Sequence, residues 1–201
     1  MIKKTLFTIL FAIIAMTGQA QQIKLIEPTL SDYLPLLESK GYKAYSFDTE
    51  KLKGAVVEPV IMEYTKGEEP KNVLNFNITM SIDKKLVIGF IPSDNDSTAN
   101  FLFHYSNYGR FGSRLHLKPI YAPEKPDDKW YMYESRPFKL GDSFKKGDFI
   151  PLVLYGSYWY EPESGACRFC GENDIKPDLS SDIVKSIPHY FVLGIRIIRN
   201  S

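Results

Sequence analysis

The sequence predicts an all-β protein, mainly antiparallel, built as a two-sheet β-sandwich with one short N-terminal helix. Roughly eight to ten short apolar segments are separated by turns rich in glycine and proline. The chain also contains 13 Phe, 13 Tyr and 2 Trp among its 201 residues, and aromatic residues favour strands. No stretch alternates strands with helices, so a parallel sheet is not expected. A closed barrel is the alternative to the sandwich.

The helix is expected within residues 29–41. Thr29 and Ser31 are candidate caps, apolar residues recur on one helical face after them, and Gly41 is a natural stop. Pro35 fits the first turn if Ser31 or a later residue is the cap, and it kinks the helix otherwise.

Strands then follow one another to the C-terminus. The clearest covers residues 73–82, where apolar and polar side chains alternate as in a half-buried strand. A turn at Asp83-Lys84 leads to its hairpin partner, residues 85–91. Pro59 marks residues 55–64 as an edge strand or a strand with a bulge. The other expected strands cover residues 43–47, 101–105, 114–121, 130–134, 149–160 and 190–199.

The N-terminus, MIKKTLFTILFAIIAMTGQAQQ, has the features of a secretory signal peptide. Lys3 and Lys4 precede an apolar run, and Gly18 and Ala20 are small residues where a signal peptidase requires them. The run is shorter than the roughly 20 residues of a membrane-spanning helix. We therefore expect a signal peptide over residues 1–20 and export to the periplasm, the cell surface or the medium. One domain is expected over residues 21–201, without a transmembrane segment.

Two resemblances accompany these patterns. Residues 18–22, Gly-Gln-Ala-Gln-Gln, resemble the signal-peptide ends of exported proteins of Bacteroides-type bacteria, and the chain is similar to small uncharacterised exported families of such bacteria. Residues 139–149 contain Gly-Asp twice, a turn chemistry that resembles immunoglobulin-like sandwiches. The first resemblance implies export, the second implies an immunoglobulin-like or jelly-roll-like arrangement, and neither implies an activity.

Charge excludes some partners. Residues 1–20 hold two of the 25 basic residues and none of the 24 acidic ones, so the rest of the chain has a formal net charge of −1. Such a balance gives no support to nucleic-acid binding and offers no basic segment for anionic lipid.

Cys167 and Cys170 are the only cysteines, within ESGACRFCGEND. An exported chain reaches an oxidising compartment, where disulfides persist. None of His104, His116 and His189 stands at ligand spacing from the cysteines, so half of a zinc site is missing. The following loop contains acids rather than the helix start that lowers the pKa of a redox thiol. We predict a structural disulfide, no metal and no cofactor. Redox work, metal binding and free thiols are the alternatives.

Four aromatic residues are candidate ligand-binding residues: Tyr158, Trp159, Tyr160 and Trp130. Successive residues of a strand face opposite sides, so Tyr158, Trp159 and Tyr160 cannot all be buried in a one-sided sheet, unless the connection over residues 161–187 covers the exposed side. Exposed aromatic rings beside polar residues form stacking platforms for sugars or peptide side chains. The alternative is that these rings fill the core.

Carboxylates occur in pairs at two places, Glu161 with Glu163 and Asp127 with Asp128. A glycosidase needs two carboxylates at a defined separation, which a sequence does not display, and solvated loops are the commoner reason for such pairs.

Two further polar patterns are weaker. His104 and His116 lie in neighbouring expected strands and could face each other, but no Gly-x-Ser-x-Gly nucleophile motif accompanies them. Residues 94–98 read as the first half of a calcium loop without its sixth-position Gly or terminal Glu, which favours a solvated turn.

The predicted function is a non-enzymatic exported module that binds a glycan or a protein partner. A hydrolase using loop carboxylates is one alternative. A structural subunit of a cell-surface assembly, pairing through the edge strand over residues 55–64, is the other.

Overall fold

A computed structural model describes residues 25–199 apart from 75–76, 108, 123–124, 142–143 and 172–173, with the backbone alone for 122 and 125–128. The chain divides into two compact units, Met1–Leu36 and Leu37–Ser201. The predicted signal peptide, residues 1–20, lies outside the described residues, so it stays a prediction, as does the single domain over residues 21–201. In the part of the chain that the structure describes, no helix is long and apolar enough to cross a membrane.

The expected N-terminal helix is present as α2 (Leu30–Ser39). Thr29 caps it, because the backbone N–H of Thr29 donates to Oδ2 of Asp32 over 2.7 Å and its hydroxyl donates to the same oxygen over 2.8 Å. An acidic side chain in the first turn also complements the helix dipole. The helix therefore begins at the first of the two predicted caps. Pro35 falls inside the helix, beyond the first position, where proline is favoured.

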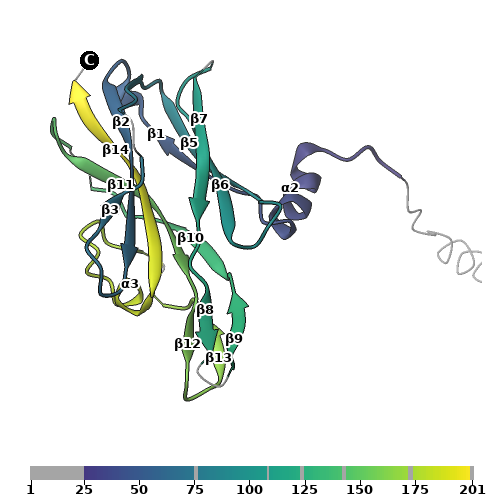
Figure 1. The fold of residues 1–201 in the computed structure, drawn as a ribbon. Helices are drawn as coiled ribbons and strands as arrows, with labels where there is room; N and C mark the ends of the chain where they lie inside the picture. Colours follow the sequence, from purple (N-terminus) through teal and green to yellow (C-terminus); the bar gives the residue numbers. More distant parts are fainter. Residues whose placement is uncertain are drawn as a thin grey trace, which may run out of the picture. The chain divides into compact units, whose positions relative to one another are not determined.

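The second unit contains the predicted β-sandwich, and its two sheets face each other in Figure 1. The first sheet has the order β1-β5-β6-β7, formed by β1 (Lys43–Asp48), β5 (Lys85–Ile91), β6 (Thr98–His104) and β7 (Arg110–His116). The second has the order β10-β11-β14-β2-β3, with β4 also paired to β2. Its strands are β10 (Tyr133–Pro137), β11 (Phe149–Ser157), β14 (His189–Arg199), β2 (Val56–Thr65), β3 (Lys71–Asn72) and β4 (Met80–Ser81). A short 3-10 helix, η1 (Glu50–Leu52), joins β1 to β2.

β14 lies at the centre of the second sheet and is buried on both faces. It pairs with β11 on one side and with β2 on the other. Leu193 enters one apolar core and its neighbour Val192 enters another. The next residue of β14, Gly194, must lack a side chain, because a Cβ at this position would lie 2.2 Å from the carbonyl oxygen of Ile150. Such a close approach of two backbones is a usual reason for glycine inside a strand.

The main core fills the space between the sheets. Along β5, buried Leu86, Ile88 and Phe90 alternate with half-buried or exposed residues, as expected for a strand with one inward face. The buried members of this core are Ala55, Val57, Ile61, Met80, Ile82, Leu86, Ile88, Phe90, Phe101, Phe103, Leu115, Ile150, Leu152, Val153, Phe191, Leu193, Ile195 and Ile197.

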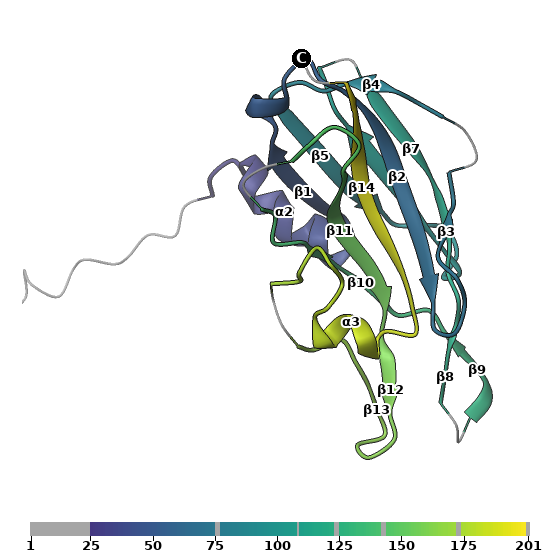
Figure 2. The ribbon, with the colours of Figure 1, turned by 90° about the vertical axis from the view of Figure 1, so that its left-hand side faces the viewer.

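A second core covers the other face of the second sheet. The segment between β13 and β14, which contains α3 (Asp182–Ser186), packs its apolar residues against the sheet (Figure 2). The buried members are Phe138, Leu154, Phe169, Ile175, Ile183, Val184, Ile187 and Val192. Arg136 fixes Phe169, since Nη2 donates to the Phe169 carbonyl over 2.8 Å and the guanidinium lies 5.0 Å from the ring centroid. The connection over residues 161–187 therefore covers part of the aromatic residues 158–160, since Tyr158 and Trp159 pack against this core while Trp159 and Tyr160 also line a groove.

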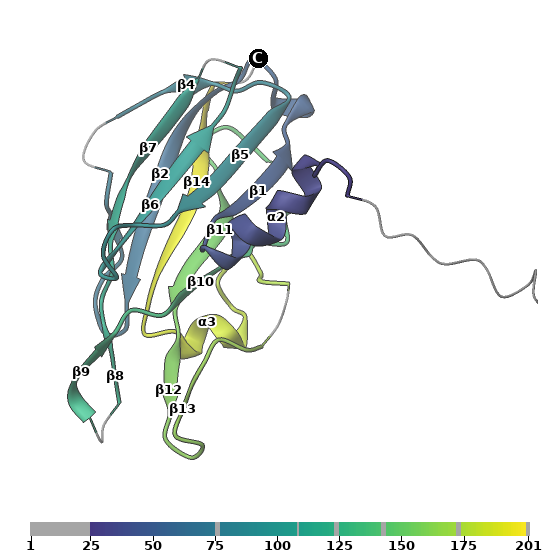
Figure 3. The ribbon, with the colours of Figure 1, turned by 90° about the vertical axis from the view of Figure 1, so that its right-hand side faces the viewer.

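Two short hairpins extend beyond the sandwich at one end (Figures 2 and 3). β8 (Ile120–Ala122) pairs with β9 (Lys125–Trp130), and β12 (Trp159–Glu161) pairs with β13 (Ala166–Arg168). Residues of β8 and β12 are in contact, so the two hairpins lie side by side.

The strand expected over residues 73–82 is largely wrong. Residues 75–76 lie outside the described residues, 73–74 and 77–79 are irregular, and only Met80 and Ser81 form a strand. Alternation indicates which face of a segment can be buried, but it does not indicate whether a partner strand runs beside it. The other differences are smaller: residues 114–121 divide between β7 and β8, 130–134 between β9 and β10, and 149–160 between β11 and β12.

The interpretation of residues 55–64 as an edge strand is wrong at both ends of the segment. β2 pairs with β14 along its whole length, and on its other side β4 pairs with Val56 and Val57 and β3 pairs with Met62 and Glu63. Pro59 is accommodated inside the sheet opposite Ile195. The assembly hypothesis depended on this edge and loses that basis.

Candidate functional site

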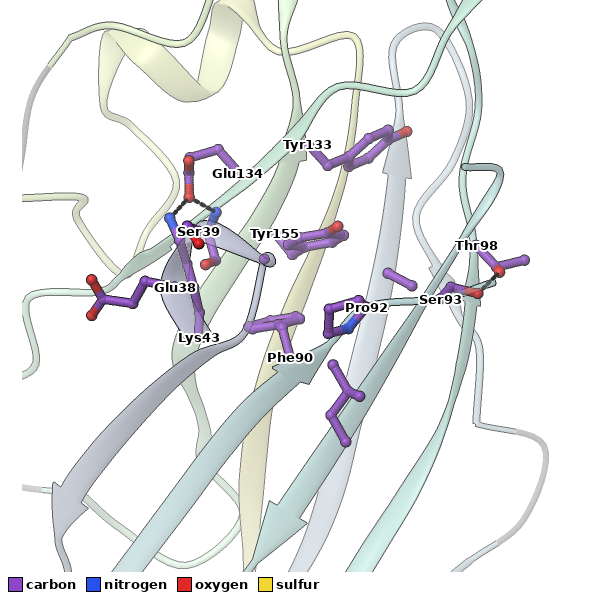
Figure 4. Close-up of a pocket in the computed structure, with 14 residues that line it drawn as sticks. Glu38, Ser39, Lys43, Phe90, Pro92, Ser93, Thr98, Tyr133, Glu134 and Tyr155 are labelled. Carbon is purple, nitrogen blue, oxygen red and sulfur yellow. Dashed lines mark hydrogen bonds and ion pairs between the residues drawn. The ribbon is translucent and has the colours of Figure 1, made fainter. Parts of the chain in front are cut away.

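A cavity of about 440 Å³ is lined by residues of both sheets of the sandwich (Figure 4). Its walls come from the start of β1, the end of β5, the start of β6, and from β10 and β11. Cavities of this size hold small ligands. The lining residues are Glu38, Ser39, Gly41, Lys43, Phe90, Ile91, Pro92, Ser93, Thr98, Ala99, Tyr133, Glu134, Ser135 and Tyr155.

Three aromatic rings form one wall. Tyr155 stacks on Phe90 with ring centroids 4.7 Å apart and on Tyr133 with centroids 5.4 Å apart, and Figure 4 shows the three rings one above another. The strand register explains the contact: Ser135 pairs with Tyr155 in β10 and β11, which places Tyr133, two residues earlier, on the same face. Burial, with a smaller effect of Glu134, raises the pKa of Tyr155 to about 12, so its hydroxyl stays protonated.

A charged pair lies beside the rings, since Lys43 is the cross-strand partner of Phe90. The Lys43 ammonium is paired with Oε1 of Glu134, which also accepts a hydrogen bond from the backbone N–H of Ser135 over 3.0 Å. Next to them, the Tyr45 hydroxyl donates to the Ser135 carbonyl over 2.8 Å. The side chains of Lys43 and Glu134 are 38% and 30% exposed, so a ligand can reach both. Glu38, the other carboxylate of the lining, points away from the rings in Figure 4.

A buried polar chain holds Tyr133 from behind. Its hydroxyl lies 2.5 Å from Nδ1 of His189, whose Nε2 lies 2.9 Å from Oε1 of Glu63. A carboxylate can only accept hydrogen bonds, so Nε2 of His189 carries a proton and donates a hydrogen bond to Glu63. The backbone N–H of Lys118 donates to the same hydroxyl over 3.1 Å, and the Lys118 carbonyl lies 3.0 Å from it.

Burial keeps the histidine of this hydrogen-bond chain neutral. His189 is only 2% exposed, and burial lowers its pKa against the opposing effect of Glu63. A neutral imidazole with its proton on Nε2 accepts a hydrogen bond from the Tyr133 hydroxyl at Nδ1. Burial also raises the pKa of Tyr133. The position of the Tyr133 ring in the cavity wall is therefore fixed by hydrogen bonds made outside the cavity.

The four aromatic residues chosen from the sequence do not form one platform. Tyr158 stacks on Phe169 of the second core, with ring centroids 5.3 Å apart. Trp159 and Tyr160, in β12, line a groove of about 600 Å³ beside β8. Trp130, at the end of β9, lines a separate hollow of about 550 Å³. Their role in ligand binding stays a prediction.

The sequence analysis missed Tyr133 and Tyr155, although each stands three residues from a chosen residue, Trp130 or Tyr158. The register between β10 and β11 decides which of these aromatic residues meet. Alternation alone indicates that Tyr133 and Tyr131 share one face, but it does not indicate what that face is opposite.

Cys167 and Cys170 are both free thiols in the structure. Cys167 lies half-buried in β13, where it pairs with Tyr160, and burial raises the pKa of its thiol. Cys170 is exposed in the segment that follows. The predicted disulfide is therefore not formed in this structure, and it stays a prediction for the exported chain.

The remaining candidates are dispersed. His104 pairs with Arg110 and His116 with Thr98, so the two histidines stand at opposite ends of the β6–β7 pair and do not face each other. Among the described residues, no group of three or more His, Cys, Asp or Glu side chains is arranged to hold a metal ion. Glu161 forms an ion pair with Arg168 at 2.7 Å. The side chains of Asp127 and Asp128 lie outside the described residues.

Fold and cavity together define a β-sandwich with a covered second sheet and a ligand-sized cavity at one side. The chain belongs to the family described as a domain of unknown function, DUF5041, which it matches over residues 12–199. No curated protein and no solved structure matches the chain.

Proposed function

We propose that this chain is a non-enzymatic binding protein that holds a carbohydrate in the cavity beside Tyr155. The observation that carries the proposal is that three stacked rings and the adjacent Lys43–Glu134 ion pair line one cavity of about 440 Å³. A sugar has apolar C–H groups that pack on aromatic rings and hydroxyl groups that need hydrogen-bond partners. A charged donor and a charged acceptor side by side suit adjacent hydroxyls.

A cavity favours a saccharide over a protein surface, because protein partners bury larger and flatter areas. Binding is also favoured over hydrolysis. Glu134 is already held by Lys43 and by the Ser135 N–H, and Glu38 points away from the rings. A glycosidase needs two carboxylates facing the same bond.

We also propose that the chain acts outside the cytoplasm, after removal of residues 1–20. The support is the pattern of Lys3, Lys4, the apolar run and the small residues up to Ala20. The resemblance of residues 18–22 to exported proteins of Bacteroides-type bacteria favours an origin in such a cell.

A glycan array followed by calorimetric titration of the best ligand tests the binding proposal. Lys43→Met is expected to weaken binding about tenfold or more, since a hydrogen bond to a charged group contributes about 1.5–3 kcal/mol. Tyr155→Leu removes ring packing of about 0.5–1.5 kcal/mol and is expected to weaken binding by about two- to tenfold. Trp159→Ala is the matched aromatic control, because Trp159 lies in a different groove. Circular dichroism of each variant verifies that it folds.

Two outcomes contradict the proposal. If no glycan binds the unaltered chain, the function is wrong. If Trp159→Ala abolishes binding while Tyr155→Leu retains it, the groove beside β8 is the ligand site and the cavity is not.

A further inference from the structure

A second cavity, of about 500 Å³, lies at the opposite end of β5 from the first. The first cavity is lined by Phe90 and Ile91, at the end of that strand, and the second by Lys85 and Val87, at its start. The lining of the second contains basic and neutral hydrogen-bonding side chains together with one carboxylate: Lys53, Asp83, Lys84, Lys85, His104, Ser106 and Asn107.

Hydrogen bonds fix the backbone that carries the lysines. The turn between β4 and β5 is tied to the end of β1, where the N–H of Thr49 donates to the Lys84 carbonyl over 2.9 Å and its hydroxyl donates to the Asp83 carbonyl over 2.6 Å. The same turn is tied to the end of β6, since the N–H of Asp83 donates to the Tyr105 carbonyl over 3.0 Å. Thr49 is only 5% exposed. Hydrogen bonds therefore fix the positions of these turns relative to one another at the cavity.

Two carboxylates, Asp83 in the lining and Asp48 close to it in the sheet, accept hydrogen bonds from backbone groups and keep their negative charge. Oδ1 of Asp83 accepts from the N–H of Lys84 over 2.8 Å, and Oδ1 of Asp48 accepts from the N–H of Glu50 over 2.9 Å. Lys84 forms an ion pair with Glu50 at 3.2 Å, but their side chains are 60% and 54% exposed. Exposed pairs of this kind contribute little and exchange readily with water or a ligand.

The other cations at this end have no carboxylate partner within the described part of the chain. Lys53 and Lys85 form no ion pair with any described residue, although Asp48 lies opposite Lys85 in the sheet. Arg110 pairs with His104 across β6 and β7 and likewise has no ion pair there. Three lysines from two chain segments, Lys53 and Lys84-Lys85, thus outnumber the one carboxylate of the lining, Asp83, so the cavity keeps an excess of positive charge.

We propose that this cavity binds a sulfate or phosphate ester group of an anionic saccharide. A tetrahedral oxyanion offers several acceptor oxygens, which match the ammonium donors of Lys53, Lys84 and Lys85. Ser106 and Asn107 supply neutral partners of the kind that sugar hydroxyls use. Among the described lining residues there is no Phe, Tyr or Trp, and the imidazole of His104 is the one ring on which a nucleobase could stack. The site is separate from the cavity beside Tyr155 and does not depend on it.

Calorimetric titration of the purified chain with glucose 6-sulfate, glucose 6-phosphate and glucose, at low ionic strength, tests the proposal. The two charged sugars are expected to bind, and the tighter one identifies whether the ester is a sulfate or a phosphate. The double variant Lys53→Gln, Lys85→Gln is expected to weaken that binding at least about tenfold. The double variant Lys71→Gln, Lys139→Gln removes the same charge from exposed lysines elsewhere and should change it less than about twofold.

Tyr155→Leu, which alters the first cavity, should leave binding of the charged sugar unchanged. The proposal is overturned if neither charged sugar binds, if glucose binds equally well and loses affinity with Lys53→Gln, Lys85→Gln, or if the control double variant weakens binding as much as the test variant. Loss of charged-sugar binding in Tyr155→Leu would also overturn it, because it would place both ligands in one site.

Discussion

Ile175 tests whether the segment between β13 and β14 is an integral layer of the fold. Its side chain is 0% exposed in the second core, and its carbonyl accepts a hydrogen bond from the N–H of Lys139 over 2.9 Å. Ile175→Ala removes three buried carbon atoms, which costs about 2.4 kcal/mol at ~0.8 kcal/mol for each. The space left behind adds to this cost. We therefore expect the free energy of unfolding to fall by about 3 kcal/mol.

Urea unfolding followed by circular dichroism and by tryptophan fluorescence measures this loss. Trp159 reports on the second core, since its ring centroid lies 6.3 Å from that of Phe169. Ile198→Ala makes the same chemical change at a residue that is 36% exposed and should cost about 0.5 kcal/mol. One transition shared by both probes is expected if the segment folds with the sheets. A loss equal to that of the control, or two separate transitions, would refute the reasoning.

Two further predictions concern pH and processing. Burial lowers the pKa of His189 in the folded chain, so the unfolded chain is protonated first as the pH falls below about 6.5. The free energy of unfolding therefore decreases as the pH decreases, by at most about 1.4 kcal/mol per pH unit for this group. His189→Gln should reduce that slope in urea titrations between about pH 7 and 5, and equal slopes would contradict the assignment. Protein exported by its own signal peptide should have the intact mass of a chain that begins at Gln21. Without reductant, its mass should be lower than that of the reduced chain by two hydrogens. A full-length mass would refute export, and an unchanged mass on reduction would refute the disulfide.

Alternation and turn chemistry predicted the fold class and many of the strands, because a strand with one face in the core has apolar residues at every second position. Residues 85–91 form a strand with the predicted bounds, and residues 190–199 fall within β14. Residues 73–82 alternate as regularly, yet form little strand. Their side chains can face the core without a regular ladder, because β2 is paired only near its two ends on that side. Periodicity records burial, whereas a strand also needs a partner edge.

The candidate sites were less predictable, because both arise from pairings between distant segments. The aromatic stretches around Trp130 and Trp159 were recognised, but the cavity wall uses Tyr133 and Tyr155 from the same stretches, since the register of β10 on β11 brings those two together. The basic cavity was invisible for a related reason. Its lysines and histidine come from three separate turns in a chain whose charges nearly balance, so no basic segment marks it.

The position of the first cavity follows from how the sandwich closes at one side. β1 and β10 are edge strands of their sheets, and side chains join them: Lys43 to Glu134 and Tyr45 to Ser135. Edge strands carry unpaired backbone groups that invite pairing with other chains, so a bridge of side chains at this edge protects the fold. The same bridge supplies the polar wall of the proposed carbohydrate site. A change at Lys43 therefore acts on stability and on binding together, and so does a change at Tyr155, whose ring packs against the main core. The two residues stabilise the fold through different contacts, so a loss of affinity shared by two variants that both fold would assign it to the cavity itself.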